Sequence, residues 1–141
     1  MNQSFEILLV EDSMDDAQLA IRALKKSNLA NSLLHLEDGQ EAINYLLDES
    51  NTMPRLVLLD LKMPKVDGLE VLRVLKSNEK RKMIPVVMLT SSKEESDIMK
   101  SYKLGVNAYI VKPVDFDQFM KAVTELGLFW LTWNQVPERT K

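Results

Sequence analysis

The chain has 141 residues, which at about 100 to 200 residues per domain leaves room for one domain and not for a catalytic domain joined to an effector domain. Hydrophobic residues make up 45% and charged residues 28% of the chain, a mixture that is typical of globular proteins and excludes a disordered chain. The net charge of −3 argues against a general attraction to nucleic acid or to an anionic membrane. We therefore expect neither among its partners.

The chain contains no cysteine, which excludes a disulfide framework, a thiolate metal site and a cysteine nucleophile. Its apolar runs are far shorter than the ~20 residues of a membrane-spanning helix. Residues 1–4 lack the basic region of a secretory signal. These features predict a cytoplasmic protein.

Five short apolar runs predict strands that are buried on both faces. They are residues 7–10, 32–36, 56–59, 86–89 and 108–111. The segments between them have helical periodicity, with apolar residues on one face. These residues are Ala17, Ala20, Ile21 and Leu24 in the first helix and Ile43, Leu46 and Leu47 in the second. A third helix is predicted from 68 or 69 to about 77.

Two further helix starts are predicted from capping patterns. Residues 92–95 (SKEE) resemble a capping box, and Asp115 with Gln118 forms a weaker one. Helices are therefore expected to begin near residues 93 and 116.

Strands that alternate with helices predict a doubly wound α/β fold, a (βα)5 parallel sheet with helices on both faces. The expected strand order is 2-1-3-4-5, as in flavodoxin-like folds, with ligands bound at the carboxyl ends of the strands. We expect one domain over 1–127, an aromatic C-terminal extension over 128–141, and no separate effector domain.

Polar residues stand where four of these strands end. Glu11 and Asp12 follow the first strand, Asp60 the third, Thr90 the fourth and Lys112 the fifth. Clustered carboxylates bind protons more tightly unless a cation lies among them, and Mg²⁺ prefers oxygen ligands. A lysine and a hydroxyl are suited to neutralising phosphoryl oxygens. The pattern predicts a Mg²⁺-dependent site in which the Asp60 carboxylate attacks phosphorus.

Four segments resemble the receiver domains of two-component response regulators of the chemotaxis-regulator type. They are residues 8–12 (LLVED), 58–64 (LLDLKMP) together with Gly68, 87–91 (VMLTS) and 109–113 (YIVKP). The resemblance extends from about Phe5 to Leu126. It implies that Asp60 accepts a phosphoryl group from a phosphohistidine of a sensor histidine kinase. Such a protein catalyses its own phosphorylation and dephosphorylation and is not a turnover enzyme.

The resemblance also implies ligands and a switch. Asp12, Asp60 and the backbone carbonyl of Lys62 would bind Mg²⁺, with Glu11 acting through water. Thr90, Ser91 and Lys112 would hold the phosphoryl oxygens. Thr90 and Tyr109 would form the switch that alters a protein-binding surface, and the peptide bond before Pro113 would be cis.

The C-terminal segment contains Phe129, Trp130 and Trp133. Large aromatic side chains commonly anchor interfaces, so the tail either folds back on its own domain or forms a homodimer contact. The tail also resembles small response regulators of phytochrome-type histidine kinases, which implies a light-responsive kinase. The output would be direct binding of a downstream protein or transfer to a histidine phosphotransfer domain.

Other protein classes share parts of this pattern. A pseudo-receiver that acts only as an unphosphorylated scaffold is the main alternative. A phosphatase of the haloacid-dehalogenase type would need an acid where Lys62 stands, and a flavin site would not suit the acidic residues after the first strand. His35 is outside every motif of the sequence and is expected to be a surface or packing histidine and not a ligand. Residues 80–82 are expected to form a solvated basic turn, and Asp15 and Asp16 only to favour a helix N-terminus.

Overall fold

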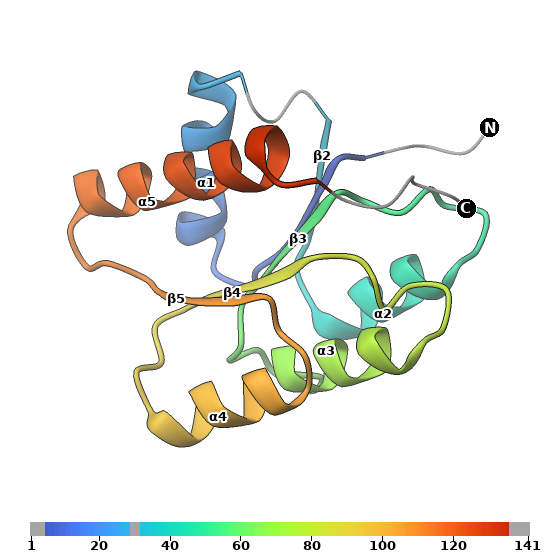
Figure 1. The fold of residues 1–141 in the computed structure, drawn as a ribbon. Helices are drawn as coiled ribbons and strands as arrows, with labels where there is room; N and C mark the ends of the chain where they lie inside the picture. Colours follow the sequence, from blue (N-terminus) through green and yellow to red (C-terminus); the bar gives the residue numbers. More distant parts are fainter. Residues whose placement is uncertain (1–4, 29–31, 136–141) are drawn as a thin grey trace.

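The computed structural model describes residues 5–28 and 32–135, and within them five parallel strands form one sheet (Figure 1). The strands are β1 (Ile7–Val10), β2 (Leu33–Leu36), β3 (Leu56–Leu59), β4 (Val86–Thr90) and β5 (Ala108–Val111). Their order is β2-β1-β3-β4-β5, which confirms the predicted order.

Helices cover both faces of the sheet. They are α1 (Met14–Lys26), α2 (Gly39–Leu47), α3 (Gly68–Ser77), α4 (Glu95–Lys103) and α5 (Phe116–Leu128), followed by a short π-type turn, η1 (Phe129–Trp133). Helices α1 and α5 lie side by side on one face, and α2 and α3 lie together on the other, with α4 beside α3 (Figure 1). The doubly wound architecture is therefore confirmed.

Two cores result from the alternation of side chains along each strand. In β1, Leu8 and Val10 enter the core beneath α2 and α3, whereas Ile7 and Leu9 enter the core beneath α1 and α5. All four are essentially inaccessible to solvent, which explains the continuous apolar runs in the sequence. Leu47 departs from the predicted helix face, since its position at the end of α2 leaves it exposed.

The helix starts agree with the capping patterns at α5 and differ at α4. The Asp115 carboxylate accepts a hydrogen bond from the Gln118 backbone N–H at 2.9 Å, so α5 begins at Phe116 as predicted. Helix α4 begins at Glu95 rather than near 93. The Ser92 hydroxyl donates to the Asp97 carboxylate at 2.6 Å, a stronger partner than a backbone amide because it is charged. The predicted capping box is therefore wrong.

Helix α4 is attached to the domain in an unusual way. Its two buried residues, Asp97 and Ser101, are both polar. The Ser101 hydroxyl donates to the Asp97 backbone carbonyl within the helix at 2.8 Å. Each of the other four long helices buries apolar side chains.

The predicted basic turn is only partly solvated. Lys80 is exposed and pairs with Glu49 at 2.6 Å. Arg81 is buried instead, and its guanidinium donates to the backbone carbonyls of Asp48 and Asn51 at 3.3 and 3.2 Å. It therefore ties this turn to the loop that follows α2, which corrects the expectation for residue 81.

The C-terminal segment folds back through its centre. Leu131 is buried in the core beneath α1 and α5, and Trp130 packs against the same core. The Arg55 guanidinium donates to the Leu131 carbonyl at 2.7 Å. Phe129 and Trp133 remain exposed. The tail therefore folds back on its own domain at Trp130. A homodimer contact stays a prediction for the exposed Phe129 and Trp133.

Leu131→Ala is expected to lower the free energy of unfolding by about 2 kcal/mol, because it removes a buried leucine from the core. Trp133→Ala is the control, since its side chain is largely exposed and surface substitutions change stability little. Urea unfolding of both variants measures the difference. Equal losses in the two variants would contradict this account of the tail.

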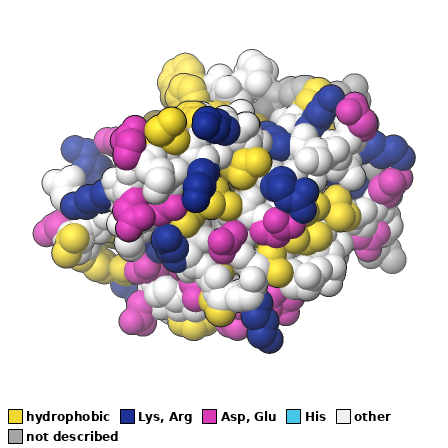
Figure 2. All heavy atoms as spheres, turned by 90° about the horizontal axis from the view of Figure 1, so that it is seen from below, with side chains coloured by type: hydrophobic (Ala, Val, Ile, Leu, Met, Phe, Trp, Pro, Cys, Tyr) yellow, Lys and Arg dark blue, Asp and Glu magenta, His cyan; other side chains and the backbone are white. Residues whose placement is uncertain are grey.

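None of the helices in the described ranges is long and apolar enough to cross a membrane. The face drawn in Figure 2 carries basic and acidic side chains interspersed with one another. This mixture agrees with the small net charge of the chain.

Candidate functional site

The candidate site lies at the carboxyl ends of β1, β3, β4 and β5, where the sequence places it. A close backbone approach shapes it. The Gly68 N–H donates to the Leu61 carbonyl at 2.8 Å, and a Cβ atom on Gly68 would lie 2.3 Å from the Asp60 carbonyl oxygen. Only glycine allows this approach without displacing the backbone, so Gly68 brings the N-terminus of α3 against the loop that carries Asp60.

Three carboxylates form an acidic cluster. Glu11, Asp12 and Asp60 each place an oxygen within 4.8 Å of the others. Glu11 and Asp60 are buried, whereas Asp12 is exposed. Burial raises the pKa of Glu11 from 4.5 to about 7, and the charge of Asp60 adds to this rise. Burial also raises the pKa of Asp60 above its ordinary range.

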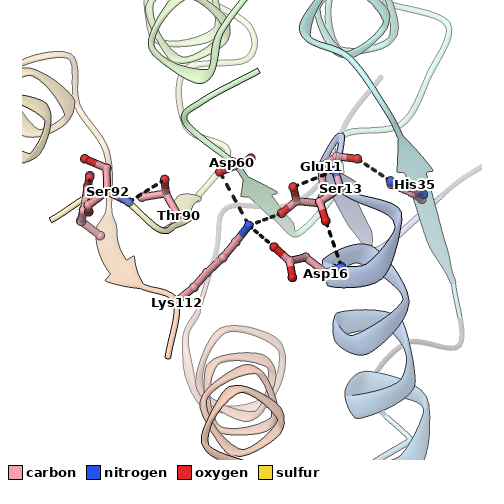
Figure 3. Close-up of polar contacts among 9 residues, drawn as sticks. Glu11, Ser13, Asp16, His35, Asp60, Thr90, Ser92 and Lys112 are labelled. Atoms are coloured by element: carbon pink, nitrogen blue, oxygen red, sulfur yellow. Dashed lines mark hydrogen bonds and ion pairs between the residues drawn. The ribbon is translucent and has the colours of Figure 1, made fainter. Parts of the chain in front are cut away.

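Lys112 reaches into this cluster from the end of β5 (Figure 3). Its Nζ lies 2.7 Å from Glu11 Oε1, 2.8 Å from Asp16 Oδ2 and 3.8 Å from Asp60 Oδ1. Burial opposes the charged form of the lysine, but hydrogen bonds to Asp16 and Glu11, together with the charges of Asp60 and Glu11, outweigh it and raise the pKa of Lys112. The ammonium is therefore charged, and Asp60 is its most distant partner of the three.

The contact of Asp16 with Lys112 is absent from the sequence-based prediction, in which this residue only favours the start of a helix. The Ser13 hydroxyl already accepts from the Asp16 backbone N–H at 3.3 Å and caps α1. The Asp16 carboxylate is thereby available to Lys112, which is 96 residues away. No local sequence pattern indicates that the first turn of α1 lies beside the end of β5.

The predicted phosphate ligands lie beside this cluster. Thr90 is fully buried at the end of β4, and its hydroxyl accepts from the Ser92 backbone N–H at 3.3 Å (Figure 3). Ser91 is exposed and lines a pocket with Asp16 and Lys112. Thr90 and Lys112 are thus on the same edge as Asp60, with Ser91 at the rim.

A polar network extends from Thr90 to α4. The Tyr109 hydroxyl donates to the Ser92 carbonyl at 3.0 Å, and the ring is partly buried against the core. The Lys62 ammonium lies 3.3 Å from the Asp97 carboxylate, which also accepts from Ser92. The predicted switch residue, Tyr109, therefore contacts the loop that follows Thr90, and the Lys62 side chain is directed to α4.

His35 and the peptide bond before Pro113 complete this region. His35 is outside every motif of the sequence, yet its Nε2 lies 2.8 Å from the Glu11 carbonyl oxygen (Figure 3). The parallel pairing of β2 with β1 brings it there, and the contact is that of a packing histidine. The peptide bond before Pro113 is trans, whereas the resemblance implies a cis bond.

The residues present fit a divalent cation. Their donors are carboxylate oxygens, the type that Mg²⁺ prefers. Burial raises the pKa values of Glu11 and Asp60, and a bound cation would favour the charged forms of both groups. Asp60 lies in this acidic cluster, 3.8 Å from the Lys112 ammonium. It follows β3, which pairs with the strand that ends at Thr90. The arrangement is suited to the transfer of a phosphoryl group to a carboxylate.

Comparison with known proteins agrees with this chemistry. Residues 7–124 match the family described as the response regulator receiver domain. The chain belongs to this family. Receiver domains are signalling components of two-component systems and not turnover enzymes, and they bind Mg²⁺ at an acidic site such as the one formed by Glu11, Asp12 and Asp60. The matched range includes every residue of the candidate site.

Relatives of this receiver are similar over most of their length. It is 43% identical over 136 residues to the probable methanogenesis regulatory protein FilR2 of Methanothrix harundinacea, covering 94% of this chain and 88% of the relative. It is 42% identical over 135 residues to response regulator Rcp1 of Synechocystis sp., covering 93% and 92%.

Solved structures show the same fold for the receiver. The Mn²⁺-bound form of Rcp1 superimposes with a TM-score of 0.88 and 42% identity, covering 94% of this chain and 98% of that one. The phosphorylated cyanobacterial phytochrome response regulator RcpA superimposes with a TM-score of 0.87 and 39% identity, covering 98% and 100%. One of these relatives is therefore solved with a divalent cation and the other in a phosphorylated form.

Proposed function

We propose that this protein is a single-domain response regulator that accepts a phosphoryl group on Asp60 from a histidine kinase and signals through a switched protein-binding surface. The observation that carries the proposal is the position of Asp60: a buried carboxylate at the end of β3, within an acidic cluster and 3.8 Å from the Lys112 ammonium. The proposal includes a domain over 1–127 with the tail 128–141 as its extension, and a cytoplasmic location.

In the proposed reaction, an Asp60 carboxylate oxygen forms a bond to phosphorus while the bond from phosphorus to the donor imidazole nitrogen breaks. The imidazole leaves with its electron pair and takes a proton from solvent. Lys112 then shifts from its present partners toward the phosphoryl oxygens and neutralises their charge. Asp12, Asp60 and the Lys62 carbonyl would hold Mg²⁺ directly, with Glu11 acting through water, and the ion supplies further charge neutralisation.

The switch follows from the network around Thr90. Its hydroxyl hydrogen is free to donate toward a phosphoryl group, since the hydroxyl oxygen serves as an acceptor for Ser92. Movement of Thr90, with Ser91 at the rim, shifts the segment that Tyr109 and Asp97 contact through Ser92. The surface formed by α4, β5 and α5 is thereby coupled to the state of Asp60 as a population shift between two packings.

The partners belong to the same proposal. Similarity to Rcp1 and to a cyanobacterial phytochrome response regulator supports a phytochrome-type kinase. The output is direct binding of a downstream protein or transfer to a histidine phosphotransfer domain. The exposed aromatics Phe129 and Trp133 are candidate contacts for a partner or for a second copy of the chain, with Trp130 behind them.

The proposal is tested by the intact mass of the protein after incubation with acetyl phosphate, with and without Mg²⁺. One phosphoryl group is expected on the wild type in the presence of Mg²⁺, and none on Asp60→Asn. Asp67→Asn is the matched control, because Asp67 caps α3 in the loop after Asp60 and asparagine caps a helix equally well. That variant is expected to be phosphorylated.

A phosphoryl group that persists on Asp60→Asn would contradict the assignment of the acceptor. A wild type that takes up no phosphoryl group from acetyl phosphate or from a phytochrome-type kinase would favour the scaffold interpretation instead.

A further inference from the structure

Lys112 has two carboxylate partners that are closer to it than the proposed acceptor. Glu11 and Asp16 lie at hydrogen-bond distance from Nζ, whereas Asp60 lies 1.0 Å farther than Asp16 (3.8 against 2.8 Å). The lysine side chain is 7% exposed, so these ion pairs are largely shielded from solvent. Its resting position is therefore set by Glu11 and Asp16.

These two partners differ in their relation to the acidic cluster. Glu11 belongs to the group of oxygens that could hold a cation, and Asp16 does not. A divalent cation among Glu11, Asp12 and Asp60 would compete with Lys112 for Glu11 and would repel its ammonium group. Asp16, on the first turn of α1, remains available to the lysine in that state (Figure 3).

We propose that Asp16 is a positioning residue that acts through Lys112: it holds the ammonium beside the acidic cluster when Mg²⁺ binds and so favours Mg²⁺ binding. This inference rests on the proposed function, because the cation and the acceptor Asp60 belong to it. Without Asp16, the lysine pairs only with residues of the cluster, and Mg²⁺ must displace it.

The test is the affinity of the unphosphorylated protein for Mg²⁺, measured by calorimetric titration. Asp16→Asn is expected to weaken binding about three- to fivefold, the scale of a partly exposed ion pair. Asp15→Asn is the matched control: Asp15 is an exposed acid on the same helical turn, so both variants remove one charge from the N-terminus of α1. The control is expected to weaken binding less than about twofold.

A double-mutant cycle separates positioning from the plain loss of a negative charge. If Asp16 acts through Lys112, the effect of Asp16→Asn is larger in the wild type than in Lys112→Met. The cycle is repeated with Lys112→Gln, so that it does not depend on the folding of one variant.

Equal effects of Asp16→Asn in the two backgrounds, or an effect no larger than that of Asp15→Asn, would overturn the role of Asp16 and leave the proposed function intact. A wild type that binds no Mg²⁺ would instead contradict the proposed function and this inference together. Uptake of a phosphoryl group by the wild type, measured separately, tells the two failures apart.

Discussion

Lys112→Met is expected to lower the free energy of unfolding by about 3 kcal/mol at about pH 8 without Mg²⁺, the lower end of the range for breaking a buried ion pair. Methionine keeps most of the volume of the lysine, so the loss comes from charge. The side chains of Glu11 and Asp60 are 4% and 8% exposed. Without the ammonium beside them, these carboxylates are buried and repel one another.

The pH dependence of the stability loss in Lys112→Met tells an effect of charge from an effect of packing. Burial already raises the pKa of Glu11 and of Asp60, and loss of the lysine raises both further. At about pH 5 the variant neutralises these groups by protonation, so the difference from the wild type is expected to shrink. Urea unfolding at the two pH values measures it. A loss of the same size at both would indicate lost packing instead.

Lys80→Met is the control for this substitution. Lys80 forms an ion pair with Glu49, but both side chains are more than 60% exposed. Solvent-exposed ion pairs contribute little to stability, so we expect no measurable change. Addition of Mg²⁺ is expected to recover part of the stability of Lys112→Met and to leave Lys80→Met unchanged.

Glu11→Gln is expected to have the opposite effect and to stabilise the metal-free protein by about 3 kcal/mol at about pH 8. The pKa of Glu11 is raised from 4.5 to about 7 by burial and by the charge of Asp60, despite the hydrogen bond to Lys112. The folded state therefore favours the protonated form, and stability falls as the pH rises from about 4.5 through 7. Glutamine resembles the protonated form at every pH.

Thermal or urea unfolding of Glu11→Gln between about pH 4 and 8 measures this effect. The variant and the wild type are expected to have equal stability at the acidic end and to diverge as the pH rises. Glu41→Gln, an exposed position in α2, controls for the loss of one negative charge. A constant difference across the range would contradict the raised pKa as its cause.

The sequence predicts most of this fold because its patterns are local. The apolar runs give strands β1, β3 and β5 with the bounds found in the structure, since a strand covered on both faces needs apolar residues throughout. The carboxyl ends of β3, β4 and β5 then fix the edge at which Asp60, Thr90 and Lys112 meet. The placement of these three residues follows from the topology of the sheet.

Interactions between distant segments are harder to predict. Asp16 and His35 have ordinary local patterns, and their contacts with Lys112 and Glu11 depend on how α1 and β2 are placed. Ser92 shows a different difficulty: its capping pattern is present, but the Asp97 carboxylate competes for the hydroxyl. Local sequence patterns thus indicate which side chains can form a cap, and tertiary packing determines which hydrogen-bond partner each side chain has.

The polar attachment of α4 has a consequence for how the domain divides into rigid and adjustable parts. Displacing a helix that buries leucine exposes apolar surface to water, at about 2 kcal/mol or more per side chain. In α4 the Ser101 hydroxyl keeps its bond within the helix, and the bonds of the Asp97 carboxylate to Ser92 and Lys62 can be exchanged for bonds to water, at about 1 kcal/mol each. Displacement of α4 therefore costs less free energy than displacement of α1, α2, α3 or α5, since each of those helices buries apolar side chains.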